Sequence, residues 1–241
     1  GRGHGPAAGQ DPAGEDWMRR RPDYSVYLVT DRAMAGARSL EAVVRAAVLA
    51  GVSIVQIREK SLGGRAFYEA AVSLRRMLDE LGRPLIVNDR LDIALACGAA
   101  GVHLGQDDLP CAEARRLAGP EFLIGVSVST PEEAAEAERN GADYLGVSPV
   151  FETPTKTDTP PAVGLEGLQR IRAVTSLPLV AIGGIHPSNA TEVIRAGADG
   201  VAVVSAIMAA PDPAVAARAL LRAVAAGRDL SQRWAGNGAQ S

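Results

Sequence analysis

Residues 84–104, PLIVNDRLDIALACGAAGVHL, contain the pattern that decides the fold. Two short apolar runs, 84–88 and 100–104, flank a helical segment that is followed by Gly98, a residue type that commonly ends helices. The runs are apolar throughout rather than alternating, as expected for strands that are covered on both faces. The stretch therefore predicts two parallel strands that are joined by a helix.

The same pattern continues in both directions along the chain. Six further strands are expected at 25–30, 52–57, 122–126, 142–148, 178–182 and 199–204. Eight strands that alternate with helices predict a single-domain α/β protein, a (β/α)8 TIM barrel. An open, doubly wound sheet is the structural alternative, but no GxGxxG motif follows the first strand to support its dinucleotide-binding version.

Local signals support the helices between these strands. Residues 39–50 place apolar side chains at i, i+3 and i+4 spacing. Thr130-Pro131-Glu132-Glu133 is typical of a capping box with proline at the first helical position. The triplets Gly141-Ala142-Asp143 and Gly197-Ala198-Asp199 both precede apolar runs, which indicates a faint internal repeat.

Composition divides the chain into three parts. Residues 1–22 are rich in Gly, Ala and Pro and are expected to be a disordered extension. Residues 23–227 would form the catalytic barrel, and residues 228–241 are expected to be a flexible tail. The whole chain has 241 residues, close to the ~250 that this barrel typically needs.

Charge and cysteine usage exclude several classes of partner. The net charge of −3 argues against a nucleic-acid-binding surface. No apolar run reaches the ~20 residues of a membrane span, so no membrane partner is expected. Cys97 and Cys111 lack CxxC spacing and are interpreted as reduced thiols of a cytoplasmic protein. The sequence leaves a homo-oligomer open.

The active site of this barrel lies at the carboxyl ends of the strands, so the residues there are the candidates. The second strand ends in Gln56-Ile57-Arg58-Glu59-Lys60, where a period of two would align Gln56, Arg58 and Lys60. Two cations and an amide suit a polyanion such as diphosphate, although a polar loop with Arg58 paired to an acid is equally compatible. Only two of the 25 basic residues are lysine, Lys60 and Lys156.

Carboxylates follow the next two strands. Asn88-Asp89 ends the third strand, and Asp108 follows the fourth. Mg²⁺ needs one or two such ligands, with water and phosphate oxygens completing its shell. The alternative is that each aspartate caps a helix, which is the commoner use of aspartate at such places.

The remaining strand ends are rich in hydroxyl groups and glycine. Ser127 ends the fifth strand, and the sixth leads into a polar loop with Thr153, Thr155 and Lys156, which is either a binding loop or an ordinary surface loop. Gly183-Gly184 follows the seventh strand, where barrels often bind phosphate. A single His103 at the end of the fourth strand is more often structural than catalytic.

Together these segments resemble the thiamine phosphate synthase family from Tyr27 to about Ala217. The matching segments are Tyr27–Asp31, Gln56–Lys60, Asn88-Asp89, Gly101–Pro110, Gly125–Ser127, Thr153–Lys156, Ile182–Ile185 and Gly197–Ser205. Each segment is short, but their occurrence in the right order is highly specific.

The resemblance implies the condensation of 4-amino-2-methyl-5-(diphosphooxymethyl)pyrimidine with a thiazole-ethyl phosphate, giving thiamine phosphate and diphosphate. It implies Mg²⁺ as cofactor, held by Asp89 and Asp108, with Arg58, Lys60, Ser127 and Lys156 in catalytic roles. The implied pyrimidine diphosphate ligands are Gln56, Ile57, Arg58, Glu59, Lys60, Asn88, Ser127 and Lys156. The implied thiazole phosphate ligands are Thr153, Pro154, Thr155, Gly184, Val204 and Ser205.

One departure from the family pattern separates two readings. Family members commonly carry histidine two residues after the Ser127 position, where this chain has Ser129. Related barrels that act as thiazole tautomerases use a histidine in this loop, so its absence favours the synthase over a tautomerase or a regulatory thiazole-phosphate-binding relative. A phosphate-binding isomerase of amino-acid biosynthesis would need a general acid and base pair, and only Asp89 presents itself.

Overall fold

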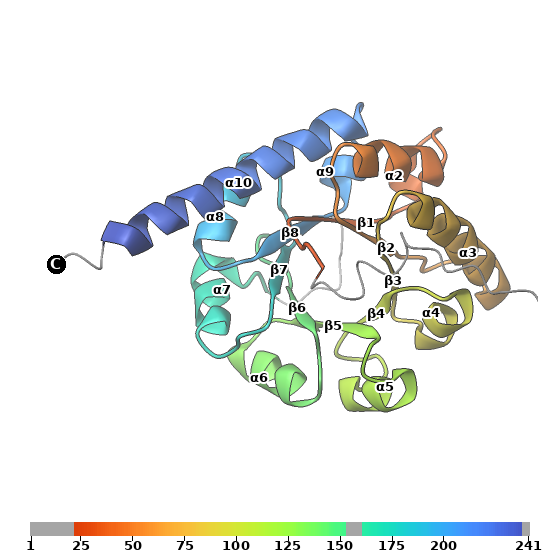
Figure 1. Cartoon of the computed structure of the whole chain (residues 1–241), viewed down its shortest axis with the longest axis horizontal. Coiled ribbons are helices and arrows are strands. Elements are labelled where there is room, and N and C mark those ends of the chain that lie inside the picture. The colour runs from red at the N-terminus through yellow and green to blue at the C-terminus, as the bar shows by residue number, and fades with distance from the viewer. Residues whose placement is uncertain (1–21, 153–160, 238–241) are drawn as a thin grey trace, which may run out of the picture.

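A closed barrel of eight parallel strands forms the centre of the molecule (Figure 1). The structure is a computed structural model that describes residues 22–152 and 161–237. The strands are β1 (Val26–Val29), β2 (Ile54–Ile57), β3 (Leu85–Asn88), β4 (Gly101–Leu104), β5 (Leu123–Val128), β6 (Tyr144–Val147), β7 (Leu179–Ile182) and β8 (Gly200–Val203). Every strand expected from the sequence is present, and β1 pairs with β8 to close the barrel.

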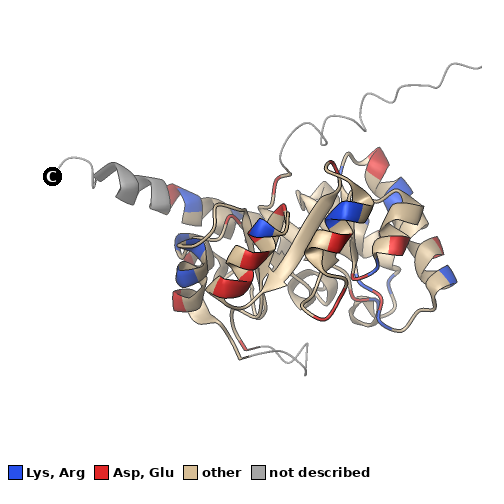
Figure 2. Cartoon of the chain, turned by 90° about the horizontal axis from the view of Figure 1, so that it is seen from below, with Lys and Arg blue, Asp and Glu red and all other residues tan. Residues whose placement is uncertain are grey.

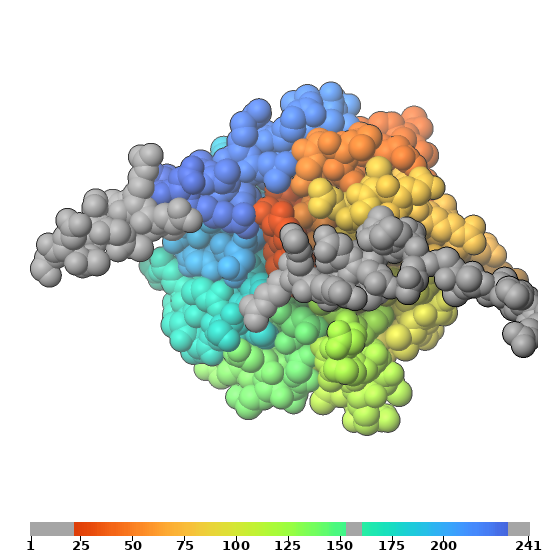
Figure 3. Space-filling model, in the orientation of Figure 1, coloured from red at the N-terminus to blue at the C-terminus, as the bar shows by residue number. Residues whose placement is uncertain are grey.

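Helices surround the barrel on the outside (Figure 1). They are η1 (Ala33–Ala35), α2 (Leu40–Leu49), α3 (Gly64–Glu80), α4 (Leu91–Cys97), α5 (Cys111–Ala118), α6 (Pro131–Arg139), α7 (Gly164–Arg172), α8 (Ala190–Arg195), α9 (Ser205–Met208) and α10 (Pro213–Asn237). The long α10 packs against α8 and α2, so the two ends of the fold meet (Figure 3). None of the helices in the described part of the chain is long and apolar enough to cross a membrane.

Alternate residues of each strand belong to two separate apolar layers. Side chains such as Leu28 and Val55 face the helices, in the larger hydrophobic cluster. Their neighbours fill the barrel interior, and this second cluster contains Tyr24, Tyr27, Val29, Ile54, Ile86, Ala100, Tyr144, Val180 and Ala202. Since both strand faces are buried, the strands read as continuous apolar runs in the sequence.

The helix ends follow the local signals. Ser39 and Thr130 cap α2 and α6, each accepting a hydrogen bond from the backbone N–H three residues later. The carboxylate of Glu133 does not complete a capping box with Thr130, because it accepts from the N–H and hydroxyl of Ser129 instead. Gly98, which the sequence predicted to end a helix, follows α4 with a positive φ of 69°.

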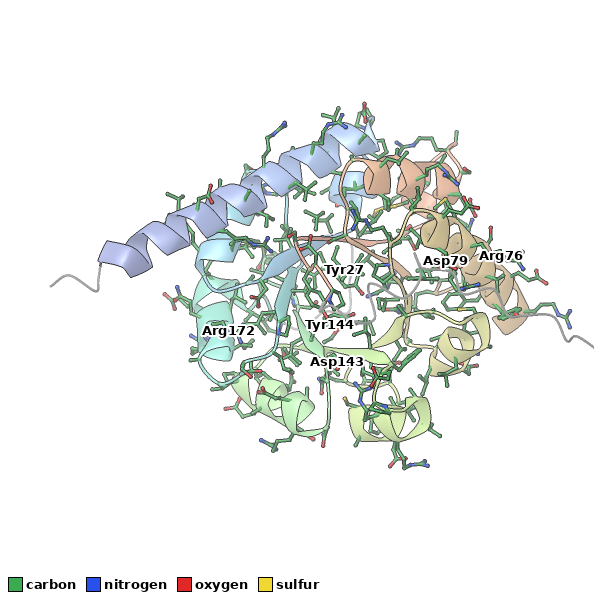
Figure 4. The ribbon with its side chains drawn as sticks, viewed as in Figure 1. Tyr27, Arg76, Asp79, Asp143, Tyr144 and Arg172 are labelled. Carbon is green, nitrogen blue, oxygen red and sulfur yellow. The ribbon has the colours of Figure 1, made fainter. Side chains whose placement is uncertain are left out.

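The aspartates of the two Gly-Ala-Asp triplets make the same set of contacts, each with an arginine and with the backbone of a neighbouring strand, and we call each set a clamp. Asp143 accepts from the N–H of Ile124 and pairs with Arg115 at 2.5 Å. Asp199 in the same way accepts from the N–H of Leu179 and pairs with Arg172 at 3.1 Å. Both arginines also donate to backbone carbonyls of the loop before the clamped strand. Each clamp thus joins the amino ends of two neighbouring strands; Asp143 and Arg172 are labelled in Figure 4.

Part of the segment expected to be a flexible tail, 228–241, lies in a helix. Helix α10 continues through this boundary to Asn237. The Arg228 side chain donates to the hydroxyl of Ser25 at 2.8 Å and to the carbonyl of Asp199 at 2.5 Å. The composition of residues 228–241 gave no indication of these contacts of Arg228, because they depend on residues far away in the sequence. The extension expected at 1–22 and the last residues, 238–241, lie outside the described residues except for Pro22.

Acidic and basic residues are interspersed over the helices rather than gathered by sign. Figure 2 shows blue and red segments side by side on the helices that face the viewer. A mixed group of charges lies at the strand ends, where Lys60, Asp89 and Asp108 are close together.

Candidate active site

A cavity opens at the carboxyl ends of the strands, where the barrel rule places the active site. It holds about 620 Å³, counting the space at its open mouth. One wall is polar, with Gln56, Arg58, Asn88, His103 and Ser127 on β2 to β5 or just after them. The opposite wall is apolar and is made by Val180, Ile182, Ala202 and Val204. The cavity can therefore hold a flat ring against one wall and polar groups against the other.

The end of β2 presents alternate residues to this cavity, as the period of two predicted. Gln56 and Arg58 line it. Ile57, between them, is fully buried in the layer that faces the helices, so only its backbone can reach a ligand. Glu59 also points away, because its carboxylate accepts two hydrogen bonds from Arg32, at 2.9 and 3.1 Å. The structure thus does not bring the side chains of Ile57 and Glu59 to a substrate.

Lys60 reaches the carboxylates of the two following strand ends. Its Nζ lies 2.5 Å from Oδ2 of Asp89, and Asp89 is beside Asp108. Burial, and then the neighbouring Asp89 carboxylate, raises the pKa of Asp108 above its ordinary value; the Gly105 N–H and the Lys60 ammonium act in the opposite direction. Two acids are therefore held close together in spite of their repulsion.

Neither aspartate is a helix cap. The positions that precede α4 and α5 are Arg90 and Pro110, and neither provides a side-chain cap. Asp89 adopts a positive φ of 64°, which is uncommon for residues other than glycine. Asp108 closes its own loop by accepting from the N–H of Gly105 at 2.7 Å. The helix-capping alternative is therefore wrong for both residues.

The carboxylate pair fits a magnesium ion in its donor chemistry. No group of three or more potential metal-binding side chains occurs within the described ranges. A pair is nevertheless sufficient for Mg²⁺, which keeps several waters and takes further oxygens from phosphate groups. Burial is the main cause of the raised pKa of Asp108, and a divalent ion would also offset the repulsion from Asp89 that adds to it.

His103 and Ser127 meet in the polar wall, and two tyrosines extend their contact across the barrel. His103 Nε2 lies 2.9 Å from Ser127 Oγ, and His103 Nδ1 lies 3.1 Å from the hydroxyl of Tyr144. The sequence reading gave no role to the tyrosines. Tyr27 and Tyr144 lie on inward strand positions and point toward each other in Figure 4. The available signal was the alternation by two along their own strands, from Asp31 back to Tyr27 and from Ser148 back to Tyr144.

Two glycines make room for these rings. A Cβ at Gly125 would lie 2.1 Å from the Tyr144 ring and 2.5 Å from His103 Nδ1. A Cβ at Gly146 would lie 2.9 Å from His103. Large side chains on β4 and β6 therefore fit because β5 and β6 present hydrogen atoms to them.

The loops after β6 and β7 pack closely against each other. Gly184 has a φ of 64°, and a Cβ there would lie 2.8 Å from that of Phe151 and 2.9 Å from the carbonyl oxygen of Glu152. Val204 lines the cavity and Ser205 begins α9. Thr153, Pro154, Thr155 and Lys156 lie outside the described residues. Ser129 precedes Thr130, the N-cap of α6, and its hydroxyl donates to Glu133 at 3.0 Å.

The fold and this cavity define a parallel-barrel enzyme that gathers cations and a carboxylate pair around one ligand site. The family model for thiamine monophosphate synthase matches residues 26–207. The thiamine-phosphate synthase of Albidiferax ferrireducens is 59% identical over 192 residues, 80% of this chain and 88% of that protein. The one from Syntrophomonas wolfei is 60% identical over 190 residues, 79% and 91% of the two chains. This chain belongs to the thiamine monophosphate synthase family and is a transferase of thiamine biosynthesis.

Solved structures agree with this assignment. The thiamine phosphate pyrophosphorylase of Pyrococcus furiosus superposes with a TM-score of 0.78 at 40% identity, over 86% of this chain and 98% of that one. A 3-hexulose-6-phosphate synthase superposes with a TM-score of 0.62 at 18% identity, which shows the barrel fold alone. The resemblance read from short motifs is confirmed, and so is the barrel.

Proposed function

We propose that the cavity binds the pyrimidine diphosphate and the thiazole phosphate together and joins them into thiamine phosphate, releasing diphosphate. The observation that carries this proposal is the polar wall of Gln56, Arg58, Asn88 and Ser127, which runs directly into the group of Lys60, Asp89 and Asp108. A ring with a charged diphosphate tail needs these two neighbouring environments. The apolar wall on β7 and β8 leaves space for a second ring.

The cations hold the leaving group in this proposal. Arg58 and Lys60 bind the diphosphate oxygens, and Lys156 joins them from the loop outside the described residues. Asp89 and Asp108 would hold Mg²⁺, which supplies further positive charge for the diphosphate. Lys60 changes partner from the Asp89 carboxylate to a phosphate oxygen. Cations placed in advance stabilise the negative charge that develops as the bond to diphosphate breaks.

Departure of diphosphate leaves a pyrimidinyl-methyl cation, which the thiazole nitrogen captures. Gln56, Asn88 and Ser127 orient the pyrimidine, and the walls of the cavity exclude water that would otherwise trap the cation. The thiazole phosphate is bound by backbone N–H groups near Gly184, Val204 and Ser205, with Thr153 to Thr155. Close approach of this backbone is possible because Gly184 has no side chain.

A cytoplasmic location is part of the proposal. Cys97 and Cys111 are both free and buried, and burial raises the pKa of each thiol. Buried protonated thiols are poorly reactive, as suits a reducing compartment.

The test is to mix both substrates with the protein and MgCl₂ and to measure thiamine phosphate and diphosphate together. Equal amounts of the two products are expected, and none when either substrate is omitted. An Asp89→Asn variant serves as a control for contaminating activity. Binding of thiazole phosphate without turnover would support a regulatory relative and overturn the proposal.

A further inference from the structure

Five side chains form a continuous line of hydrogen bonds across the interior of the barrel, and all five line the cavity. The Gln56 amide donates to the hydroxyl of Tyr27 at 2.9 Å. That hydroxyl lies 2.8 Å from the hydroxyl of Tyr144. Tyr144 contacts Nδ1 of His103 at 3.1 Å, and Nε2 of His103 contacts Ser127 Oγ at 2.9 Å. The line thus connects two cavity residues, Gln56 and Ser127, through β1, β6 and β4.

We propose that Tyr27 and Tyr144 are positioning residues that give this line one direction, in which each group donates its hydrogen to the next from Gln56 towards Ser127. In that direction His103 carries its proton on Nε2, and the hydrogen of the Ser127 hydroxyl points to a lone pair of the bound ligand. The second statement rests on the proposed function, which places Ser127 against the pyrimidine diphosphate. The first concerns the protein alone and can be tested without substrate.

The direction follows from counting hydrogens. Both tyrosines are almost completely buried, at 2% and 1% exposure. Burial raises the pKa of each phenol well above its ordinary value, so each keeps its single hydrogen. Because the Tyr27 oxygen already accepts from the Gln56 amide, its hydrogen is available for Tyr144. Tyr144 in turn donates its hydrogen to His103 Nδ1, which must accept.

The consequence reaches Ser127. Once Nδ1 is an acceptor, neutral His103 carries its hydrogen on Nε2 and donates it to Ser127 Oγ. The hydroxyl hydrogen of Ser127 is then turned away from His103. Ser127 lines the cavity, so this hydrogen is presented to a ligand rather than to the protein. A phosphate oxygen or an unprotonated ring nitrogen is the kind of group that accepts it.

Packing keeps the line from rearranging. Tyr144 is surrounded by rings, with centroids of Tyr24 at 5.1 Å, His103 at 5.5 Å and Tyr27 at 6.0 Å. Gly125 and Gly146 fit against the Tyr144 and His103 rings from the other side. Rotation of a ring would need several neighbours to move together, so the hydrogen-bond direction is the property that a substitution can alter while the shape is kept.

The experiment is nitrogen NMR of imidazole-labelled protein, which distinguishes a protonated from an unprotonated ring nitrogen. The chain has only three histidines, so a His103→Gln sample assigns the signals. The full-length protein without substrate is expected to show His103 with hydrogen on Nε2 alone. An ionised carboxylate at position 56 can only accept a hydrogen bond. Gln56→Glu is therefore expected to reverse every donor and acceptor along the line, which would move the ring hydrogen of His103 to Nδ1. His103 with hydrogen on Nδ1 in the unaltered protein overturns the proposal, as does an unchanged tautomer in Gln56→Glu at every pH where the protein is folded.

Kinetics test the positioning role. Tyr144→Phe and Tyr27→Phe keep the ring and remove the hydroxyl, and each is expected to lower kcat by about tenfold with little change in KM. Tyr68→Phe is the matched control, because Tyr68 is 39% exposed on α3. Unchanged kcat in both interior variants overturns the positioning role. Failure of the proposed function would appear differently, as no diphosphate release from the unaltered protein.

Discussion

Lys60 Nζ lies 2.5 Å from Oδ2 of Asp89, although Lys60 follows β2 and Asp89 follows β3. The Lys60 side chain is 57% exposed and Asp89 is 21% exposed, so this contact faces the solvent at the rim of the cavity. An exposed ion pair contributes little to stability. We propose instead that the pair consists of a cation and a metal ligand that both bind the same anionic substrate.

The first prediction concerns metal dependence. Asp89→Asn and Asp108→Asn remove one carboxylate each and are expected to lower kcat/KM by at least about a hundredfold at low Mg²⁺, while the fold survives. Asp107→Asn is the control, because Asp107 is exposed beside Asp108. Magnesium titrations of the initial rate measure the effect. Ordinary Mg²⁺ dependence in both variants would refute the assignment.

The second prediction concerns stability and pH. The folded-state pKa of Asp108 is raised, so the folded protein holds its proton more tightly than the unfolded chain. The charged form therefore costs stability once the pH rises through the ordinary and then the raised pKa, and this cost is absent below both values. Asp108→Asn is expected to raise Tm by a few degrees at neutral pH without metal, and not in acid.

Bound Mg²⁺ should remove the higher Tm that Asp108→Asn has over the unaltered protein. Saturating Mg²⁺ stabilises a protein that binds it, so the Tm of the unaltered protein should rise while that of Asp108→Asn stays nearly constant. Thermal melts with MgCl₂ and with EDTA give the comparison. A lower Tm for Asp108→Asn in EDTA would show that the hydrogen bond to Gly105 outweighs the repulsion.

The third prediction concerns the loop after β7. Gly184→Ala introduces a Cβ against Phe151 and Glu152, and it is expected to raise the KM for thiazole phosphate more than that for the pyrimidine diphosphate. Gly82→Ala is the matched control, since Gly82 has a φ of 62° with nothing within 4 Å of its Cβ. Both variants should lose about 1 kcal/mol from the positive φ, and only Gly184→Ala should lose more. An equal rise in both KM values would show that this loop does not bind the thiazole.

The fourth prediction concerns Lys156, which lies outside the described residues. Lys156→Ala is expected to lower kcat by about a hundredfold, or about 3 kcal/mol, because a cation on the leaving group acts mainly in the transition state. Lys156→Arg should rescue it poorly, since guanidinium is planar and larger than ammonium. Steady-state kinetics with Tm as a folding control measure both. Near-normal kcat in Lys156→Arg would show that charge alone matters.

The fifth prediction concerns the repeated clamp. Asp143→Ala removes the partner of Arg115 and of the Ile124 N–H and should cost about 2 kcal/mol of unfolding free energy. Glu113 forms an exposed i,i+3 pair with Arg116, so Glu113→Ala should cost at most about 0.5 kcal/mol. Urea unfolding of both variants compares the two sites. Equal losses would mean that the clamp adds nothing beyond an ordinary surface pair.

Several site residues could be predicted because their position depends on strand order alone. Parallel strands in a barrel all end at one face, so Gln56, Arg58 and Asn88 had to come together once eight strands were recognised. The motif match then gave the family. Ile57 and Glu59 were expected to be ligands only because they belong to the matching segment. Their side chains alternate with those of Gln56 and Arg58 and point away from the cavity.

The sequence by itself determined the eight strands, the helix ends and the face that carries the chemistry, because each depends on short-range patterns of apolar residues, caps and glycines. Only the tertiary structure decided that Tyr27 meets Tyr144, 117 positions away, and that His103 links them to Ser127. Closure of the barrel sets the stagger between strands, and this stagger decides which inward residues share a level. That relation is a property of the closed sheet, and no segment of the chain carries it alone.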